Sequence, residues 1–293
     1  MKIEIQNTSK TYLNGKKALM DANITLEPGV YALFGENGAG KSTLMKILAG
    51  LLKPSTGKIL VDGQEMSPLA DAYREKIGYL PQDTPVYSNF TAAKFLSYLA
   101  TVKGVPKQDV QTSVMSALEA VNMTEHANKK LKSFSGGMKR RIGIAQLLLN
   151  DPELLIIDEP TAGLDPKERI HFRNLIASIA RKRIVLLSTH IVSDVGSIAR
   201  EIILMKQGRI IKQANPYELL DEIATEIWTV DVTDQELLDL QETYQIGSIQ
   251  QTRQGKNRVR IISSQLPHPK AVQDEPQLED LYLYHLDGRG KSA

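Results

Sequence analysis

The sequence predicts an α/β fold in which a mostly parallel sheet is covered by helices, followed by a small C-terminal α/β appendage. Residues 154–157 and 184–187 are uninterruptedly aliphatic, as expected of central parallel strands that are buried on both faces. Such strands alternate along the chain with helical patterns, which is the order of a doubly wound sheet. The pattern changes beyond about residue 217, where the appendage is expected to begin.

Composition narrows the classes of function. The 293 residues can hold one large domain or a domain and a smaller one. With 36 basic and 34 acidic residues, the net charge of +2 does not indicate a nucleic acid or a charged membrane as partner. The absence of cysteine excludes disulfides and fits a reducing compartment. The first five residues alternate like a strand rather than a signal peptide, and no apolar run approaches the ~20 residues that span a bilayer.

The elements of the first part follow from periodicity. Two helical patterns place apolar residues on one face each and form an all-helical insertion, the second beginning at Pro106, a residue suited to the first helical position. A hairpin is expected through Gln207-Gly208. Strands are expected over residues 2–12, 22–26, 30–34, 57–61, 77–80, 154–157, 184–187, 202–205 and 209–211, and helices over 44–52, 91–103, 106–121, from 135–137 onward, and 167–180.

The C-terminal appendage is expected to hold strands over 228–232, 246–252 and 258–262, a helix over 235–244 and a loop over 266–275. Lys256, Arg258 and Arg260 are interpreted as one exposed strand face. We interpret the appendage as stabilising a dimer or docking a partner. A regulatory ligand-binding module is the alternative, although the segment carries no recognisable ligand motif.

The most informative motif is the glycine-rich stretch between the strand at 30–34 and the following helix. Gly35, Gly40, Lys41 and Ser42 fit G-x-x-x-x-G-K-[ST], the phosphate-binding P-loop. Glycines let the main chain wrap closely around a triphosphate, and the helix that follows directs its free N–H groups at the anion. Lys41 is expected to reach the β- and γ-phosphates, and the Ser42 hydroxyl to hold Mg²⁺.

Polar residues follow three other strands. Asp158 and Glu159 end the aliphatic strand at 154–157, where Asp158 is placed to bind Mg²⁺ and Glu159 to polarise a water. Gln82 and His190 also follow predicted strands. Because ligands collect at the carboxyl ends of parallel strands, we expect all four residues at one edge of the sheet. Arg140 and Arg141, in contrast, are interpreted as solvated helix residues.

These motifs, in this order, resemble those of the ATPase subunit of ABC transporters over residues 1–217. The resemblance implies a RecA-like core, an antiparallel β subdomain and a helical subdomain at about residues 88–150, with residues 218–293 as an accessory domain. The drug- and antibiotic-exporter branch is the most similar, because Met138 stands where most of the family has Gln and Leu278–Tyr282 is similar to that branch's ending. Phe134 departs from the usual Leu of the signature.

The resemblance assigns a role to each motif. It implies catalytic roles for Lys41, Glu159 and the switch histidine His190. Metal ligands would be Ser42, Gln82 and Asp158. The signature Ser135, Gly136 and Gly137 would act in trans, and Asp165 of the D-loop would communicate across a dimer. The nucleotide-binding residues implied are Tyr12, which would stack on adenine, and Gly35, Glu36, Asn37, Gly38, Ala39, Gly40, Lys41, Ser42, Thr43 and Gln82.

One P-loop and one signature make half of a double site. The resemblance therefore implies ATP and Mg²⁺ held between two copies, or between this chain and a paralogue, with hydrolysis powering transport by a separate transmembrane permease, with export favoured. The protein would then lie at the cytoplasmic face of the membrane, held there by the permease. A soluble ABC ATPase that acts on ribosomes or nucleic acid is the alternative, and the near-neutral charge lacks the basic footprint expected for it.

Overall fold

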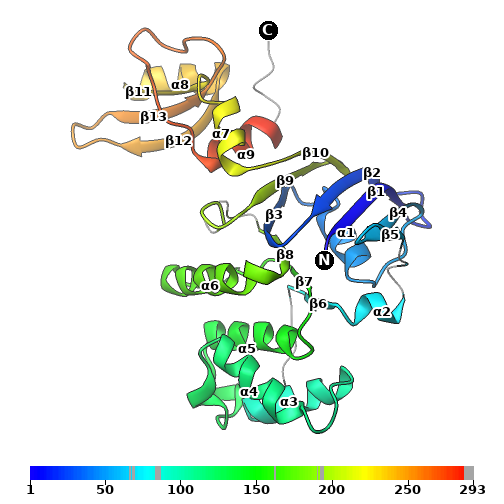
Figure 1. The fold of residues 1–293 in the computed structure, drawn as a ribbon. Coiled ribbons are helices and arrows are strands. Elements are labelled where there is room, and N and C mark those ends of the chain that lie inside the picture. The colour runs from blue at the N-terminus through cyan, green and yellow to red at the C-terminus, as the bar shows by residue number, and fades with distance from the viewer. Residues whose placement is uncertain are drawn as a thin grey trace. The chain divides into compact units, whose positions relative to one another are not determined.

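The computed structural model describes residues 1–65, 67, 70–82, 87–161, 163–189, 191 and 195–286. The chain divides into two compact units, Met1–Gln213 and Ala214–Ala293. Each is described by itself below (Figure 1). Within the described residues, no helix combines the length and the apolar character that crossing a membrane requires.

A six-stranded sheet organises the first unit. Its order is β10-β9-β3-β8-β7-β6, and neighbours from β6 to β9 pair in parallel. Gln207 and Gly208 both adopt positive φ in the tight turn between β9 and β10, as a two-residue hairpin requires. The predicted α/β class is confirmed. The strands are β3 (Gly29–Gly35), β6 (Ile77–Leu80), β7 (Leu154–Ile157), β8 (Ile184–Ser188), β9 (Glu201–Lys206) and β10 (Arg209–Ala214).

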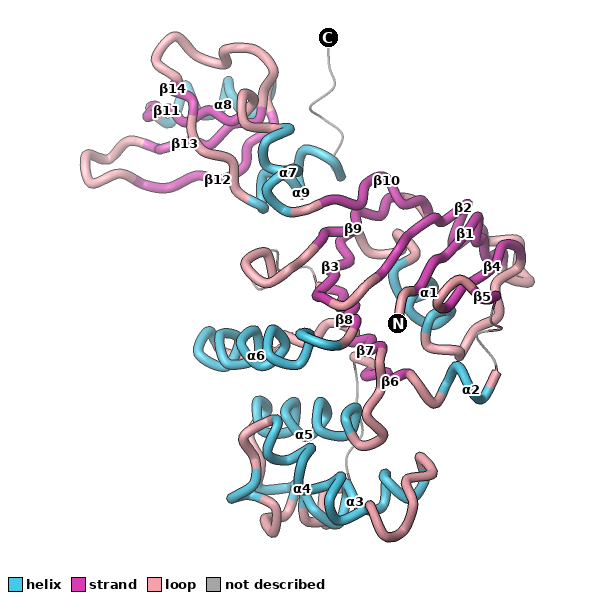
Figure 2. Tube along the Cα trace, in the orientation of Figure 1, coloured by secondary structure: helices cyan, strands magenta, loops and turns pink. Residues whose placement is uncertain are grey.

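A second sheet in this unit is antiparallel, with the order β2-β1-β4-β5 (Figure 2). β2 begins five residues earlier than the sequence predicts, and the two-residue β5 was not predicted. Both follow from pairing with neighbouring strands, which local periodicity does not report. The strands are β1 (Ile3–Thr11), β2 (Lys17–Leu26), β4 (Thr56–Val61) and β5 (Gln64–Glu65).

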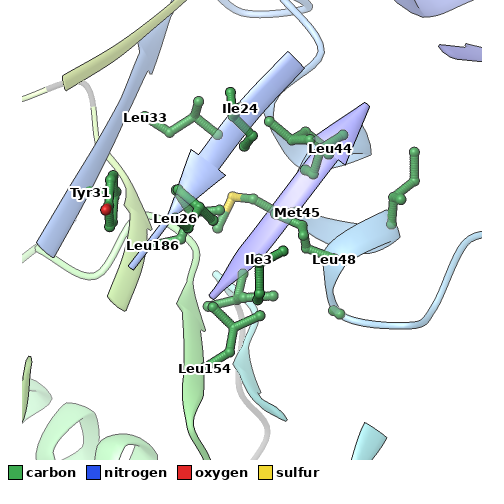
Figure 3. Close-up of a cluster of buried hydrophobic side chains, with 14 of the residues drawn as sticks. Ile3, Ile24, Leu26, Tyr31, Leu33, Leu44, Met45, Leu48, Leu154 and Leu186 are labelled. Carbon is green, nitrogen blue, oxygen red and sulfur yellow. The ribbon is translucent and has the colours of Figure 1, made fainter. Parts of the chain in front are cut away.

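Helix α1 (Lys41–Leu48) packs in the core that the two sheets share. Its Met45 belongs to one buried cluster with Leu26 of the antiparallel sheet and with Leu154 and Leu186 of the parallel sheet (Figure 3). Burial of such side chains contributes about 1.5–3 kcal/mol each. The core therefore fixes the first turn of α1, and with it the P-loop, between two sheets.

Three helices, α3, α4 and α5, form the insertion, and α5 also packs against the sheet. Gly78 in β6 permits this close approach, because a Cβ there would lie 2.9 Å from Leu155 and 3.2 Å from Leu147 of α5. α4 begins at Val110 instead of 106, since the main chain turns between Pro106 and Asp109. The helices are α2 (Asp71–Arg74), α3 (Ala92–Val102), α4 (Val110–Ala120), α5 (Gly136–Leu148) and α6 (Pro166–Ile179), with 3-10 turns at Thr124–His126, Leu131–Ser133 and Ala180–Lys182.

As far as the structure describes it, the second unit consists of a four-stranded antiparallel sheet of order β12-β13-β11-β14 and three helices. α8 begins with a capping box between Thr233 and Glu236. The predicted loop over 266–275 contains β14, and α7 and α9 were not predicted. The elements are α7 (Pro216–Glu222), β11 (Ile227–Val232), α8 (Asp234–Thr243), β12 (Gln245–Gln251), β13 (Asn257–Ile262), β14 (Val272–Gln273) and α9 (Leu278–Leu286).

The interpretation of Arg260 as part of an exposed strand face is wrong. Its side chain is only 10% exposed, whereas that of Arg258, two residues earlier on the same strand, is 56% exposed. Arg260 donates through Nε and Nη2 to the carboxylate of Asp280, at 2.7–3.0 Å, and through Nη1 to Asp274 at 2.6 Å. The chain from Asp274 to Asp280 covers this part of the strand, a tertiary contact that alternation along β13 does not reveal.

Candidate functional site

A cavity of about 300 Å³ lies where β3 ends and α1 begins. It brings together residues from the P-loop, from the ends of β6 and β7, and from the segment that joins β1 to β2. The lining residues are Tyr12, Lys16, Ala18, Glu36, Asn37, Gly38, Ala39, Gly40, Lys41, Ser42, Thr43, Gln82, Asp158 and Glu159. The convergence expected from the sequence is therefore present for Gln82, Asp158 and Glu159.

The P-loop is shaped by glycine where it enters α1. Gly40 has φ +105°, and a Cβ on it would lie 2.4 Å from the main-chain oxygen of Ala18. No side chain caps the helix at Gly40, and the first residues of α1 line the cavity. The free N–H groups of a helix start stabilise an anion. Gly35 borders this loop, and a Cβ there would lie 2.4 Å from the Met205 main-chain oxygen.

Lys41 folds back over the loop. Its Nζ donates to the main-chain oxygens of Gly35 at 2.5 Å and Glu36 at 3.1 Å. Burial lowers the pKa of Lys41, while the carboxylates of Glu159 and Asp158 act in the opposite direction. The ammonium group is thus held close to the site where a phosphate would supply additional negative charge.

The two carboxylates at the end of β7 are anchored by Ser188, the last residue of β8. Ser188 Oγ donates to Asp158 Oδ1 at 2.5 Å and accepts the main-chain N–H of Glu159 at 3.0 Å. Ser188 is fully buried. Glu159 has φ +45°, a left-handed conformation that is uncommon for residues other than glycine. This hydroxyl therefore helps to fix both the direction of Asp158 and the turn at Glu159.

Tyr12 borders the cavity from the segment that joins β1 to β2. Its hydroxyl lies 3.3 Å from Thr43 Oγ1, and the residue is 37% exposed. Lys10 Nζ lies 5.8 Å from the ring centroid. A partly exposed aromatic ring beside a P-loop can stack on a flat base.

The signature segment begins another helix. Ser135 caps α5 by accepting the Met138 N–H at 3.2 Å, and Asp165 caps α6 by accepting the Glu168 N–H at 2.9 Å. A Cβ on Gly137 would lie 2.5 Å from Glu168 Oε2, so the two helix starts are in contact. Among the described residues that line the cavity, none comes from the signature or the D-loop.

His190 lies outside the described residues. The sequence-based expectation that it stands at the same edge of the sheet therefore stays a prediction.

Two residues of the site were missed by sequence reasoning. Ser188 follows the predicted strand at 184–187 and received no role, because its position opposite Asp158 depends on the pairing of β7 with β8. The interpretation of Arg140 as solvated is wrong, because its guanidinium donates to main-chain oxygens at the end of β7. Arg141 pairs with Glu168 at 3.4 Å and is also largely covered. The only local sequence signal for the position of these two arginines is that they follow directly after the signature.

Known proteins are similar to this chain in sequence and in fold. The pattern of the ABC transporter family matches residues 19–162. Nod factor export ATP-binding protein I of Rhizobium etli is 32% identical over an alignment of 298 positions, and the alignment covers 98% of this chain and 93% of that protein. Lantibiotic transport ATP-binding protein SrtF of Streptococcus pyogenes is 38% identical over 226 residues, which cover 75% of this chain and 95% of that protein.

Solved structures are similar to about three quarters of the chain. cbiO1 from Clostridium perfringens, part of the ABC transporter complex cbiONQ, has a TM-score of 0.69 at 31% identity and covers 75% of this chain and 90% of its own. The ATP-binding cassette MJ0796, solved as a dimer bound to ADP and Pi, has a TM-score of 0.64 at 25% identity, with coverage of 73% and 98%. With relatives matched over nearly their full length, this chain belongs to the family of ABC transporter ATP-binding proteins, the ATPase subunits that couple hydrolysis of ATP to transport.

Proposed function

We propose that the cavity at the P-loop is the hydrolytic site and that its residues act as the sequence predicts. Lys41 and the N–H groups of residues 35–43 bind the phosphates, Tyr12 stacks on the adenine, and Glu159 polarises the attacking water. The observation that carries this proposal is the meeting of the P-loop with Gln82, Asp158 and Glu159 in one cavity. His190 is proposed to support the water and the γ-phosphate.

The donor set of this cavity suits Mg²⁺. Mg²⁺ prefers oxygen ligands and is commonly held by one or two carboxylates together with substrate phosphates and waters. The Ser42 hydroxyl, the Asp158 carboxylate and the Gln82 amide provide such oxygens. Among the described residues, no group of three or more His, Cys, Asp or Glu side chains could hold a metal ion. When bound, Mg²⁺ would neutralise the charge that develops on the phosphates.

A second copy, or a paralogue, would complete the site. Ser135, Gly136 and Gly137 start a helix of 13 residues, and helix starts stabilise anions. Since this segment does not line the cavity of its own chain, we propose that it faces the γ-phosphate of the partner copy, with Asp165 beside it. The similar cassette MJ0796 has been solved as a dimer, which supports this arrangement.

A separate transmembrane permease would use the energy of the ATPase cycle, and we propose export as the direction. The name of the Nod factor export relative supports export, and the lantibiotic transport relative and the transporter complex that contains cbiO1 support a role beside a transport partner. The protein would lie at the cytoplasmic face of the membrane through its permease. Residues 1–217, with a helical part at about 88–150, would form the ATPase domain, and 218–293 an accessory domain. The structural division after Gln213 supports this boundary.

Substitution of Lys41 tests the site. Lys41→Ala should lower the affinity for ATP at least about tenfold, because a charged hydrogen-bonding partner of the phosphates contributes about 1.5–3 kcal/mol. The measurement is equilibrium binding of a fluorescent ATP analogue, with Lys46→Ala on the same helix as the control. Unchanged affinity in Lys41→Ala would remove the P-loop lysine from the account.

Purification from native membranes tests the transport role. The tagged protein should be recovered with a polytopic membrane protein, and addition of that protein should stimulate ATP hydrolysis. Recovery with ribosomes alone, without a membrane protein, would instead favour the alternative of a soluble ABC ATPase.

A further inference from the structure

The guanidinium of Arg140, in α5, donates hydrogen bonds to several main-chain oxygens at the end of β7. Nε donates to the oxygen of Pro160 at 2.8 Å, and Nη2 donates to those of Asp158 at 3.0 Å and Glu159 at 2.9 Å. Nη1 donates to the oxygen of Gln82 at 3.3 Å. One side chain thus binds three successive carbonyl groups after β7 and a fourth after β6.

One of the carbonyl groups that Arg140 binds belongs to Glu159, whose main-chain conformation is unfavourable. Glu159 has φ +45°, and non-glycine residues keep such a conformation only when their surroundings hold it. Its N–H is held by Ser188 Oγ and its carbonyl oxygen by Arg140. The two side chains therefore hold the peptide groups on both sides of Glu159, which determines where its carboxylate points.

Arg140 stands near the start of the helix that the signature begins. It follows the cap residue Ser135 by five positions, and Gly137 of the same turn contacts Glu168 at the start of α6. The helix is rigid over this distance because it has regular i→i−4 hydrogen bonds. A shift of the helix start would therefore move the guanidinium relative to the end of β7.

We propose that Arg140 is a positioning residue that links the location of the signature helix α5 to the placement of Glu159. The inference rests on the proposed function, in which Glu159 polarises the water and the signature contacts the ATP of the partner copy. When the partner's ATP engages Ser135–Gly137, the position of α5 is fixed, and Arg140 in turn fixes Glu159 of its own site. Each copy would then be competent for hydrolysis only after its signature has been engaged.

The test replaces the planar guanidinium while keeping the charge. Lysine is a point donor that cannot reach four carbonyl groups in one plane. In Arg140→Lys, kcat should fall by about 10- to 100-fold, since misplacement of a catalytic group by about 1 Å has that effect. The Kd for ATP should stay within about threefold, because Arg140 does not line the cavity. Both values are measured on the full chain, together with the thermal unfolding midpoint.

Arg183 provides a matched control at the opposite end of the same strand. It donates to the main-chain oxygen of Pro152 at 3.1 Å and pairs with Asp151, both before β7 begins, and it donates to the main-chain oxygen of Ile179 at the end of α6 at 3.4 Å. Arg183→Lys removes comparable bonds from a place remote from the cavity. It should therefore lower thermal stability as Arg140→Lys does and leave kcat unchanged.

A double variant separates positioning from a general effect on the site. If Arg140 acts through Glu159, the slow single-turnover hydrolysis of Glu159→Gln should not fall further when Arg140→Lys is added. An independent fall in the double variant, or an Arg140→Lys enzyme with normal kcat, would overturn the inference. If Glu159→Gln itself hydrolyses ATP at the normal rate, the proposed function fails instead, so the two failures are distinguishable.

Discussion

Removal of Arg260 should destabilise the C-terminal unit far more than removal of Arg258, although both arginines lie on β13 and both donate through Nε and Nη2 to an aspartate carboxylate. The Arg258 pair with Asp231 is 56% and 40% exposed, whereas the Arg260 pair with Asp280 is 10% and 2% exposed. Breaking a buried pair leaves an uncompensated charge and costs about 3–5 kcal/mol. An exposed pair contributes about 0–1 kcal/mol.

The single tryptophan of the chain makes this measurement selective. Trp228 lies in β11, opposite Ile261 of β13, and its Nε1 donates to the Ser263 main-chain oxygen at 2.9 Å. Urea unfolding followed by tryptophan fluorescence therefore reports the C-terminal unit within the full chain. Since domains are stable by only about 5–15 kcal/mol, Arg260→Ala should shift the midpoint strongly and Arg258→Ala only slightly.

A double variant checks the physical reason. Replacing Arg260 with Met and Asp280 with Leu removes both buried charges, so it should recover much of the stability that Arg260→Ala loses. Equal midpoints for Arg258→Ala and Arg260→Ala would refute the reasoning, because burial of the pair would then have no energetic consequence.

Three further predictions concern the first unit. Burial lowers the pKa of Lys103 from 10.5 to about 8, so between these pH values the unfolded chain binds more protons than the folded one. The free energy of unfolding should therefore rise as the pH increases through this window. Urea unfolding at each pH measures this rise, which should vanish in Lys103→Met. Tyr12→Ala should weaken ATP binding about tenfold, since stacking contributes about 1–3 kcal/mol per base, whereas Tyr12→Phe, which loses only the contact with Thr43, should bind nearly normally in a titration. Gly40→Ala should bind no ATP in calorimetry, because its Cβ would meet the oxygen of Ala18 at 2.4 Å; normal binding would show that the loop can rearrange.

Motifs with a local physical basis could be predicted from the sequence. The P-loop predicts its strand, turn and helix because all the residues that phosphate binding requires, the spaced glycines and the lysine, lie within eight positions. The buried strand at Leu154–Ile157 and the hairpin at Gln207-Gly208 were placed correctly for the same reason. The edge where Gln82, Asp158 and Glu159 meet followed from the rule for parallel strands.

Features that depend on distant partners could not be predicted. Whether Arg140 is solvated depends on the end of β7, eighteen to twenty residues away in the sequence, and whether Arg260 is buried depends on Asp280. β14 has only two residues and exists through its pairing with β11. No local pattern records such contacts, since the same residues on an uncovered surface would be exposed.

The most direct test of the central claim is the mass of Glu159→Gln in solution with and without ATP. Without its carboxylate the enzyme should bind Mg²⁺ and ATP but hydrolyse the nucleotide only very slowly, so the closed state should accumulate. Light scattering should then show a mass that rises from one chain to two on addition of Mg²⁺ and ATP, reversed when Ser135→Arg is also present. A chain that stays monomeric with ATP bound, or that hydrolyses ATP at the normal rate, would contradict the account of a site completed by a second copy.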